Sequence, residues 1–290
     1  VGANGFPGYR PETSGEWQRE TRAVYVDLTM PFSDTWLTTA AFRAEDFSDF
    51  GTHVDGKLSL RWQATQTLAY RSSVSTGFKA PTVGQSNIIN ISTKFGLNGL
   101  EDQITLPPTN SVAVKLGARE LTPEESVNFS VGLMASLSPA AQLTLDFYQI
   151  YLADRISTTS AIELDEQTIG LLLEQGFEEA ETYRSAKFFT NDFDTRTRGL
   201  DLVFNWQFDL QGWQHQLLAT LNWTDTQVIR VTTQDYEQRD GTVNLTTQRI
   251  RMLEDNLPAY RANISLTQSF GAHQLAWQVH YFGAFYEDHL

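Results

Sequence analysis

Apolar and polar residues alternate along the segment that follows Gly199. The apolar positions are Leu200, Leu202, Phe204, Trp206 and Phe208, and polar side chains occupy most of the positions between them. Because successive side chains of a β-strand point to opposite faces, this pattern predicts a strand with one apolar face and one mostly polar face. The run covers about ten residues, which is the length that a tilted strand needs to cross the hydrocarbon layer of a membrane.

The same unit recurs along the chain. The alternation predicts about ten strands, at residues 17–30, 36–45, 57–62, 67–78, 126–137, 142–156, 200–208, 214–226, 260–270 and 274–286. Short turns at residues 31–34, 63–66, 138–141, 209–213 and 271–273 alternate with longer connections, which include the polar inserts at about 79–125, 157–197 and 227–258. Leucines among glutamates in the middle of the second insert, residues 163–184, predict a short helix there.

This alternation of short and long connections decides between two fold classes. Outer-membrane barrels have short turns on the periplasmic side and long loops outside. A soluble sandwich would place long loops at either end, and long structureless loops are uncommon in compact domains. The sequence therefore predicts an all-β fold, an antiparallel meander of about ten strands that forms part of a transmembrane β-barrel with long extracellular loops.

Composition excludes several other classes. The 290 residues carry a net charge of −14, which disfavours nucleic acid as a partner because nucleic-acid binding needs a basic surface. No apolar run approaches the roughly 18 residues of a membrane-spanning helix. Cysteine is absent, so thiolate metal sites, thiol nucleophiles and disulfides are absent too. The chain begins at Val1 without an initiator Met or a signal peptide, and we expect a processed or truncated start.

Five segments, in this order along the chain, resemble the C-terminal half of the barrel of TonB-dependent receptors, which are ligand-gated importers of Gram-negative outer membranes. They are Ser48–Gly51, Arg71–Pro81 (a Gly-Phe-Arg-Ala-Pro run with Lys79 in place of Arg), Leu121–Ser126, Leu145–Ile156 and Thr197–Asp201. Because the globular plug, the early strands and the closing strands of that family are not seen, we interpret residues 1–290 as a single, partial barrel domain. Unpaired strand edges are costly in lipid, so this segment alone should not form a working pore.

The resemblance implies a function and a location. We expect the Gram-negative outer membrane, contact with its lipid, and energy-coupled import of a scarce small-molecule ligand: a siderophore, haem, cobalamin or an oligosaccharide. Contact with the TonB complex would be made by a missing N-terminal segment. No bond is made or broken in such import, so neither enzyme activity nor a cofactor is expected. The alternatives are a passive porin, a soluble β-rich carbohydrate-binding or adhesion module, and a catalytic barrel.

Candidate ligand-binding residues come from the loops and from the polar face of the strands. Phe95, Tyr183 and Tyr236 lie on the long inserts and have aromatic rings that can stack on a ligand. Arg71 and His280 stand at the alternate positions of their strands that point to the polar face, which we call the parity of that face. A charged side chain on that face avoids lipid.

The sequence offers little evidence for a metal site. The five histidines lack the spacing of a zinc motif. Asp46, Asp49, His53 and Asp55 can be interpreted as a cation site or, more simply, as a solvated acidic loop. The glutamates of the second insert have the same simple explanation, with a cationic or metal-chelated ligand as the functional alternative. We therefore predict no metal site.

Overall fold

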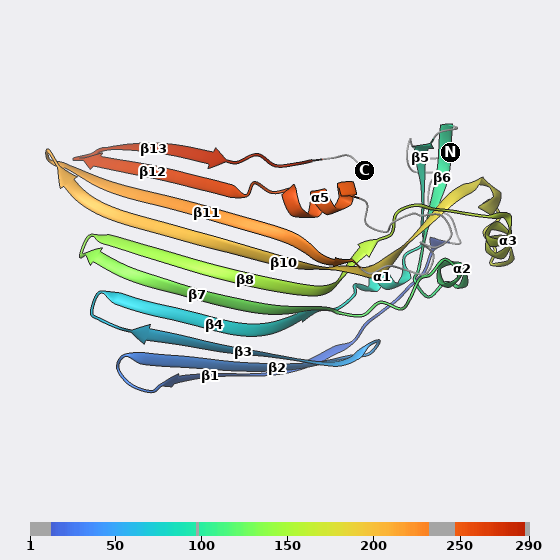
Figure 1. Ribbon diagram of the computed structural model, residues 1–290, viewed down its shortest axis with the longest axis horizontal. Coiled ribbons are helices and arrows are strands. Elements are labelled where there is room, and N and C mark those ends of the chain that lie inside the picture. Colours follow the sequence, from blue (N-terminus) through green and yellow to red (C-terminus); the bar gives the residue numbers. More distant parts are fainter. Residues whose placement is uncertain (1–12, 97–98, 232–246, 288–290) are drawn as a thin grey trace.

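The computed structural model describes residues 13–96, 99–231 and 247–287. Ten strands form one antiparallel meander in which each strand pairs with the next along the path β1-β2-β3-β4-β7-β8-β10-β11-β12-β13 (Figure 1). Their bounds are β1 Thr21–Pro31, β2 Trp36–Phe47, β3 Gly51–Gln63, β4 Leu68–Lys79, β7 Glu124–Ser138, β8 Ala141–Thr158, β10 Tyr183–Leu210, β11 Trp213–Val231, β12 Tyr260–Phe270 and β13 His273–Phe282. The antiparallel meander predicted from the alternation is confirmed.

The strand register places the apolar positions of the ten strands on one face, which we call the apolar face. One row of paired residues crosses nine of the strands and consists of Trp36, Trp62, Tyr70, Leu133, Leu145, Leu202, Leu221, Ala262 and Tyr281. These side chains do not form a buried core, since Trp62 is 38% exposed, Leu221 41% and Tyr281 59%. Soluble monomers rarely expose so continuous an apolar surface.

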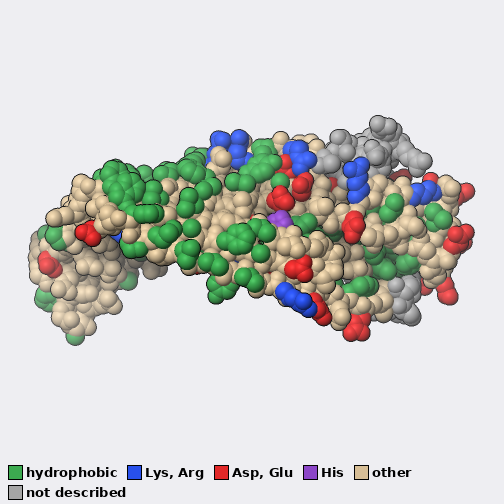
Figure 2. All heavy atoms as spheres, turned by 90° about the horizontal axis from the view of Figure 1, so that it is seen from below, with side chains coloured by type: hydrophobic (Ala, Val, Ile, Leu, Met, Phe, Trp, Pro, Cys, Tyr) green, Lys and Arg blue, Asp and Glu red, His purple; other side chains and the backbone are tan. Residues whose placement is uncertain are grey.

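Aromatic rings gather at the end of the apolar face that carries the short turns. Trp36 and Trp62 stack at 5.2 Å between ring centroids, and Trp62 stacks on Tyr70 at 5.7 Å. A second group near the turns of β10–β13 includes Trp206 on Phe208 at 4.2 Å. Figure 2 shows hydrophobic side chains over the half of the molecule nearer the short turns and most charged side chains over the other half. An aromatic girdle of this kind is typical of a membrane–water interface.

The packed core of the protein lies beyond the opposite ends of the strands, in a structure that we call the loop cap (Figure 1). It is built from two inserts and contains β5 Asn90–Gly96, β6 Gly99–Leu106, α2 Ser111–Lys115, β9 Ile162–Glu163, α3 Glu166–Glu174, η2 Ala180–Thr182 and the start of β10. Its buried residues include Ile104, Leu172, Tyr183 and Phe188, all 0% exposed. β6 pairs with β10 in parallel, so the cap is hydrogen-bonded directly to a strand of the meander.

The structure corrects the sequence analysis at the inserts. Residues 79–125 were predicted as one loop, yet they form α1 Val83–Asn87 together with β5, β6 and α2. The helix predicted in the second insert is confirmed as α3, with Asp165 as its N-cap. The strand predicted to begin at about Leu200 begins at Tyr183, because β10 continues through the meander into the cap.

The third insert also contains a helix that the sequence analysis did not predict, α5 Thr247–Asp255, which lies against β11. None of the helices in the described part of the chain is long and apolar enough to span a membrane.

Candidate functional site

A transverse row of charged and amide side chains crosses the polar face of the sheet. The strand register aligns its members side by side, in the order Arg61, Arg71, Gly132, Asp146, Asp201, Asn222 and Arg261. Each residue comes from a different strand, from β3 to β12, and the pairing of the strands sets the lateral order of the charges. This row is the candidate functional site.

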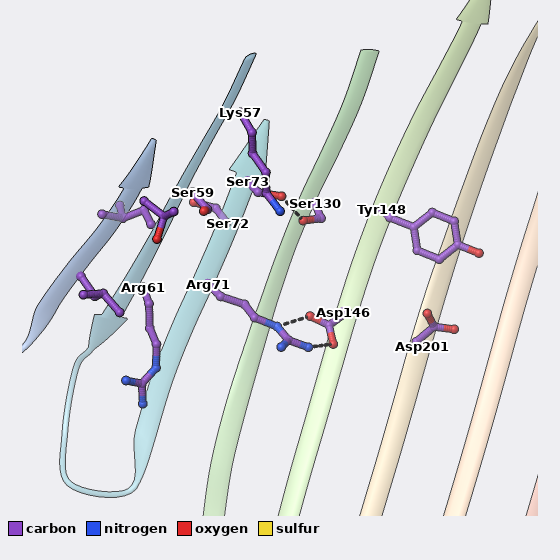
Figure 3. Close-up of a pocket in the computed structure, with 13 residues that line it drawn as sticks. Lys57, Ser59, Arg61, Arg71, Ser72, Ser73, Ser130, Asp146, Tyr148 and Asp201 are labelled. Atoms are coloured by element: carbon purple, nitrogen blue, oxygen red, sulfur yellow. Dashed lines mark hydrogen bonds and ion pairs between the residues drawn. The ribbon is translucent and has the colours of Figure 1, made fainter. Parts of the chain in front are cut away.

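The centre of the row is an ion pair between Arg71 and Asp146. The Arg71 Nε donates to Asp146 Oδ1 at 2.7 Å, and the Nη2 donates to the other carboxylate oxygen. Figure 3 shows the two side chains reaching toward each other across the strand between them. That strand contributes Gly132, where a Cβ atom would lie 1.9 Å from Asp146 Oδ1. A glycine is therefore needed for the pair to form in this geometry.

A second side chain crosses a glycine on the next row toward the cap. Tyr148 on β8 lies over Gly199 on β10 and its hydroxyl forms a hydrogen bond of 3.0 Å with the Thr224 hydroxyl on β11. A Cβ atom at residue 199 would lie 2.1 Å from Tyr148 Cζ. An aromatic ring laid over a glycine covers the backbone that the missing side chain exposes.

In the part of the row that lies on β10, β11 and β12, the side chains are linked by hydrogen bonds. Asn222 donates its amide to Asp201 Oδ1 at 2.6 Å, and its carbonyl oxygen accepts from Arg261 Nε at 3.1 Å and Nη2 at 2.9 Å. Asn222 thus links an anion to a cation with both of its polar atoms. The row can bind polar or ionic groups because it holds two cations, then two anions, then a third cation at fixed positions on neighbouring strands.

Two hollows flank the ion pair on the polar face. One has a volume of about 520 Å³ and is lined by Arg71, Asp146, Lys57, Arg61 and Tyr148, among others (Figure 3). The other, of about 490 Å³, lies over β8 to β13 and includes His280 in its lining. The structure therefore places two of the predicted candidates, Arg71 and His280, on the same polar face and at the edges of adjacent hollows.

Of the three aromatic candidates, the structure describes two, and both belong to the loop cap. Tyr183 is fully buried in the core of the loop cap, so its ring packs against protein and has no exposed face for a ligand. Phe95 belongs to β5 at the tip of its hairpin with β6, where its backbone pairs with Leu100. Tyr236 lies outside the described residues.

The acidic segment around the β2–β3 turn is held together by other contacts. Asp49 forms a bidentate pair with Arg19, whose guanidinium lies 5.0 Å from the ring centroid of Phe50. Asp46 accepts from the Thr52 hydroxyl at 2.8 Å. Within the described part of the chain, no group of three or more His, Asp or Glu side chains gathers as a metal site would require.

A buried carboxylate fastens the strands together between the meander and the loop cap. Asp194 is 2% exposed and accepts from Arg230 Nε at 2.6 Å, Tyr151 Oη at 2.7 Å and the Asp154 amide at 2.9 Å. Burial alone would raise the pKa of Asp194, but the hydrogen bonds from Arg230, Asp154 and Tyr151 outweigh it and lower the pKa below its usual value. The carboxylate therefore stays charged and holds β8, β10 and β11 together.

Sequence reasoning missed Asp146, Asp201, Gly132 and Gly199. The alternation of side chains along each strand could have placed them, since all four residues stand at positions that point to the polar face. The sequence alone does not show which of these residues face one another across strands, because that depends on the register between β4, β7, β8 and β10.

Comparisons with known proteins agree with this architecture. Residues 1–289 match the family model described as TonB dependent receptor-like, beta-barrel. The siderophore receptor PirA from Pseudomonas aeruginosa has 14% identity and a TM-score of 0.56, over 91% of this chain and 40% of that one. The ferric enterobactin receptor PfeA from the same organism has 14% identity and a TM-score of 0.61, over 97% of this chain and 35% of that one.

A third solved structure, the RagAB peptide importer, has 12% identity and a TM-score of 0.59, over 90% of this chain and 33% of that one. The chain thus spans about a third to two fifths of the length of these solved chains. No curated protein matches it.

Proposed function

This chain belongs to the TonB-dependent receptor family by its β-barrel domain, and we propose that it forms part of an outer-membrane receptor that imports a scarce ligand by energy-coupled gating. The two faces of the meander are the observation that carries the proposal. An apolar face with an aromatic girdle suits lipid, and a polar face with an ordered row of charges suits the water-filled interior of a barrel.

Energetics support this orientation of the two faces. A charged side chain at the middle of the hydrocarbon layer costs about 2–4 kcal/mol when it faces lipid. The row from Arg61 to Arg261 crosses strands at the level of Leu202 and Leu133 on the other face. Lipid against the apolar face therefore leaves the charged row in the interior, where Arg71 and His280 meet a passing ligand or the plug of the complete receptor.

The family and the solved structures that this chain resembles support a proposal for the ligand class. We propose a siderophore, haem, cobalamin or an oligosaccharide, and two of the similar structures are a siderophore receptor and a ferric enterobactin receptor. Contact with the TonB complex lies in the part of the receptor that precedes this chain. In this proposal the receptor makes or breaks no bond, so it needs no cofactor and is not an enzyme.

An uptake experiment separates this function from a passive porin. Cells that express the full-length receptor are offered radiolabelled ferric siderophores, haem, cobalamin and oligosaccharides, each with and without an uncoupler of the proton gradient. We expect one ligand to accumulate only with the gradient intact. Accumulation of several ligands regardless of the uncoupler would identify a passive pore and overturn the proposal.

A further inference from the structure

A transverse row of hydroxyl groups crosses the polar face beside the charged row, on the side nearer the loop cap. The strand register aligns one residue from each of eight neighbouring strands, in the order Thr29, Thr39, Ser59, Ser73, Ser130, Tyr148, Gly199 and Thr224. Each of these residues carries a hydroxyl, apart from Gly199, which the Tyr148 ring covers. We call this series the hydroxyl row, and none of its members is charged.

The hollow of about 520 Å³ beside the Arg71–Asp146 pair opens onto this row. Five consecutive members of the row line the hollow, namely Thr39, Ser59, Ser73, Ser130 and Tyr148. Figure 3 shows the last four of them on adjacent strands, one row farther along the strands than the ion pair. A volume of this size is within the range of small-molecule pockets, which is about 300–1,000 Å³.

Much of the hydrogen-bonding capacity of the row is unused. Ser73 and Ser130 share one hydrogen bond of 2.8 Å between their hydroxyls. In the described part of the chain, the hydroxyls of Thr39 and Ser59 have no hydrogen-bond partner, and both residues are partly exposed. Because a hydroxyl donates one hydrogen bond and can accept two, the bonded members also keep capacity for a ligand.

The charged side chains around the hollow balance one another. Three basic and two acidic side chains line it, and these are Lys57, Arg61, Arg71, Asp146 and Asp201. Asp55 stands two residues before Lys57 on the same face of its strand and adds a third acid. The hollow therefore has no surplus of charge that would select an anion or a cation.

We propose that the hydroxyl row and its hollow bind a neutral oligosaccharide. The inference rests on the proposed function, because it takes the polar face to line the water-filled interior, and it narrows the ligand to one of the four classes. Sugar hydroxyls donate and accept hydrogen bonds as serine, threonine and tyrosine hydroxyls do, so the two sets can pair fully. Hydroxyls on neighbouring strands recur about every 4.8 Å, a spacing comparable to the length of one sugar unit.

The other ligand classes of the proposed function match this hollow poorly. Haem and cobalamin present broad apolar ring systems, and a negatively charged ferric siderophore needs a surplus of cations. The position of the row also suits a ligand that arrives from outside. The row crosses β10 at Gly199, directly after the lipid-facing Leu200 and on the side of the loop cap, so it lies at the outer end of the part of the interior that lipid surrounds.

The test measures sugar binding by the purified full-length receptor in detergent. Fragments of α-glucan, β-glucan, xylan and galactan serve as neutral probes, and alginate fragments serve as the acidic comparison. Each is titrated into the receptor in a calorimeter. We expect at least one neutral fragment to bind with a Kd of about 1 mM or lower, and more tightly than the alginate fragments.

A double variant tests the row itself. Thr39→Val with Ser59→Ala removes two hydroxyls from the lining of the hollow. This variant should bind the neutral fragment at least about fivefold more weakly, because two neutral hydrogen bonds are worth that much or more. The matched control is Thr38→Val, which removes a hydroxyl from the neighbouring residue on the apolar face, where Thr38 pairs with Leu60. The control should bind as the wild type does.

A conservative variant guards against misfolding. Thr39→Ser with Ser59→Thr keeps both hydroxyls and should retain most of the affinity, and heat-modifiable gel mobility checks that each variant is folded. Loss of affinity in this variant as large as in Thr39→Val with Ser59→Ala would count against the proposal.

Four other outcomes overturn the proposal: no neutral fragment binds the wild type, alginate binds more tightly than every neutral fragment, the double variant binds undiminished, or Thr38→Val loses as much affinity. Uptake by the wild type, measured in parallel, separates this site from the import function. Energy-dependent uptake of a siderophore, haem or cobalamin without sugar binding would reject the site and leave import standing. Sugar binding without energy-dependent uptake would reject import and leave the site standing.

Discussion

Gly199 provides a sharp test of how the polar face is built. The Tyr148 ring lies over this glycine, and a Cβ atom there would sit 2.1 Å from Cζ and 2.2 Å from the hydroxyl oxygen. Gly199→Ala must therefore displace the ring and break its 3.0 Å hydrogen bond to Thr224. Removing Tyr148 first, as Tyr148→Ala, leaves open space over the glycine.

The two backgrounds should give effects of opposite sign. In the wild type, Gly199→Ala loses a hydrogen bond worth about 0.5–1.5 kcal/mol and the packing of a ring, which is worth a similar amount. The substitution also regains about 0.5–1 kcal/mol, because glycine loses more conformational freedom than alanine when it is fixed in a strand. We expect net destabilisation of about 1 kcal/mol in the wild type and stabilisation of about 0.5–1 kcal/mol in Tyr148→Ala.

The assay is reversible urea unfolding of the full-length receptor in lipid vesicles, followed by the loss of heat-modifiable gel mobility. Tyr148→Phe serves as the control that removes only the hydroxyl, and it should cost about 1 kcal/mol. An effect of Gly199→Ala that has the same sign and size in both backgrounds would refute the ring-over-glycine geometry.

Three further predictions follow from the site and the loop cap. Gly132→Ala should abolish the Arg71–Asp146 pair as effectively as Arg71→Ala does. Each substitution should lower the free energy of unfolding in urea by only about 0–1 kcal/mol, because the pair is partly exposed. A loss of unfolding free energy that doubles when the two substitutions are combined would contradict this. The lowered pKa of Asp194 means that its stabilisation is complete above about pH 4 and is lost as the pH falls through the lowered pKa. Asp194→Asn should lack that acid-dependent loss when thermal unfolding is followed as the pH falls below about 4. Phe188→Ala empties a fully buried position and should destabilise the loop cap by about 3–5 kcal/mol, seen as faster proteolysis of residues 79–124 while the strands near the short turns stay protected.

Much of the meander could be predicted from the sequence because one face of each strand meets an apolar environment. That requirement repeats every second residue, so a run such as Val127 to Leu137 predicts both the strand and which of its two faces is apolar. Short turns fixed the strand pairing, since antiparallel neighbours joined by a few residues have few alternative registers.

The loop cap could not be predicted by the same reasoning. Its core joins Ile104 and Leu106 from one insert with Leu172, Tyr183 and Phe188 from another, and none of these residues belongs to a long periodic run. Both inserts were interpreted as loops because they are rich in polar and charged residues, with a single short helix predicted in the second. Tyr183 was proposed as a ligand contact for this reason, although the structure uses it as a core residue.

The candidate site was predicted only in part for a related reason. Parity placed Arg71 and His280 on the polar face, because it depends on one strand at a time. The partners of Arg71 depend on three strands and on a glycine between them, so the pair with Asp146 required the register across β4, β7 and β8.

The central claim is that one face of the sheet meets lipid and the other meets water, and accessibility along β10 tests it most directly. This chain contains no cysteine, so single cysteines at residues 200 to 208 can each carry a nitroxide label in the full-length receptor in lipid vesicles. The account predicts that labels at even-numbered positions such as Leu202 and Phe204 collide with dissolved oxygen, whereas labels at odd-numbered positions such as Asp201 and Asn205 collide with a water-soluble nickel chelate. Even-numbered labels that are shielded from both reagents, or an absence of two-residue periodicity, would contradict it.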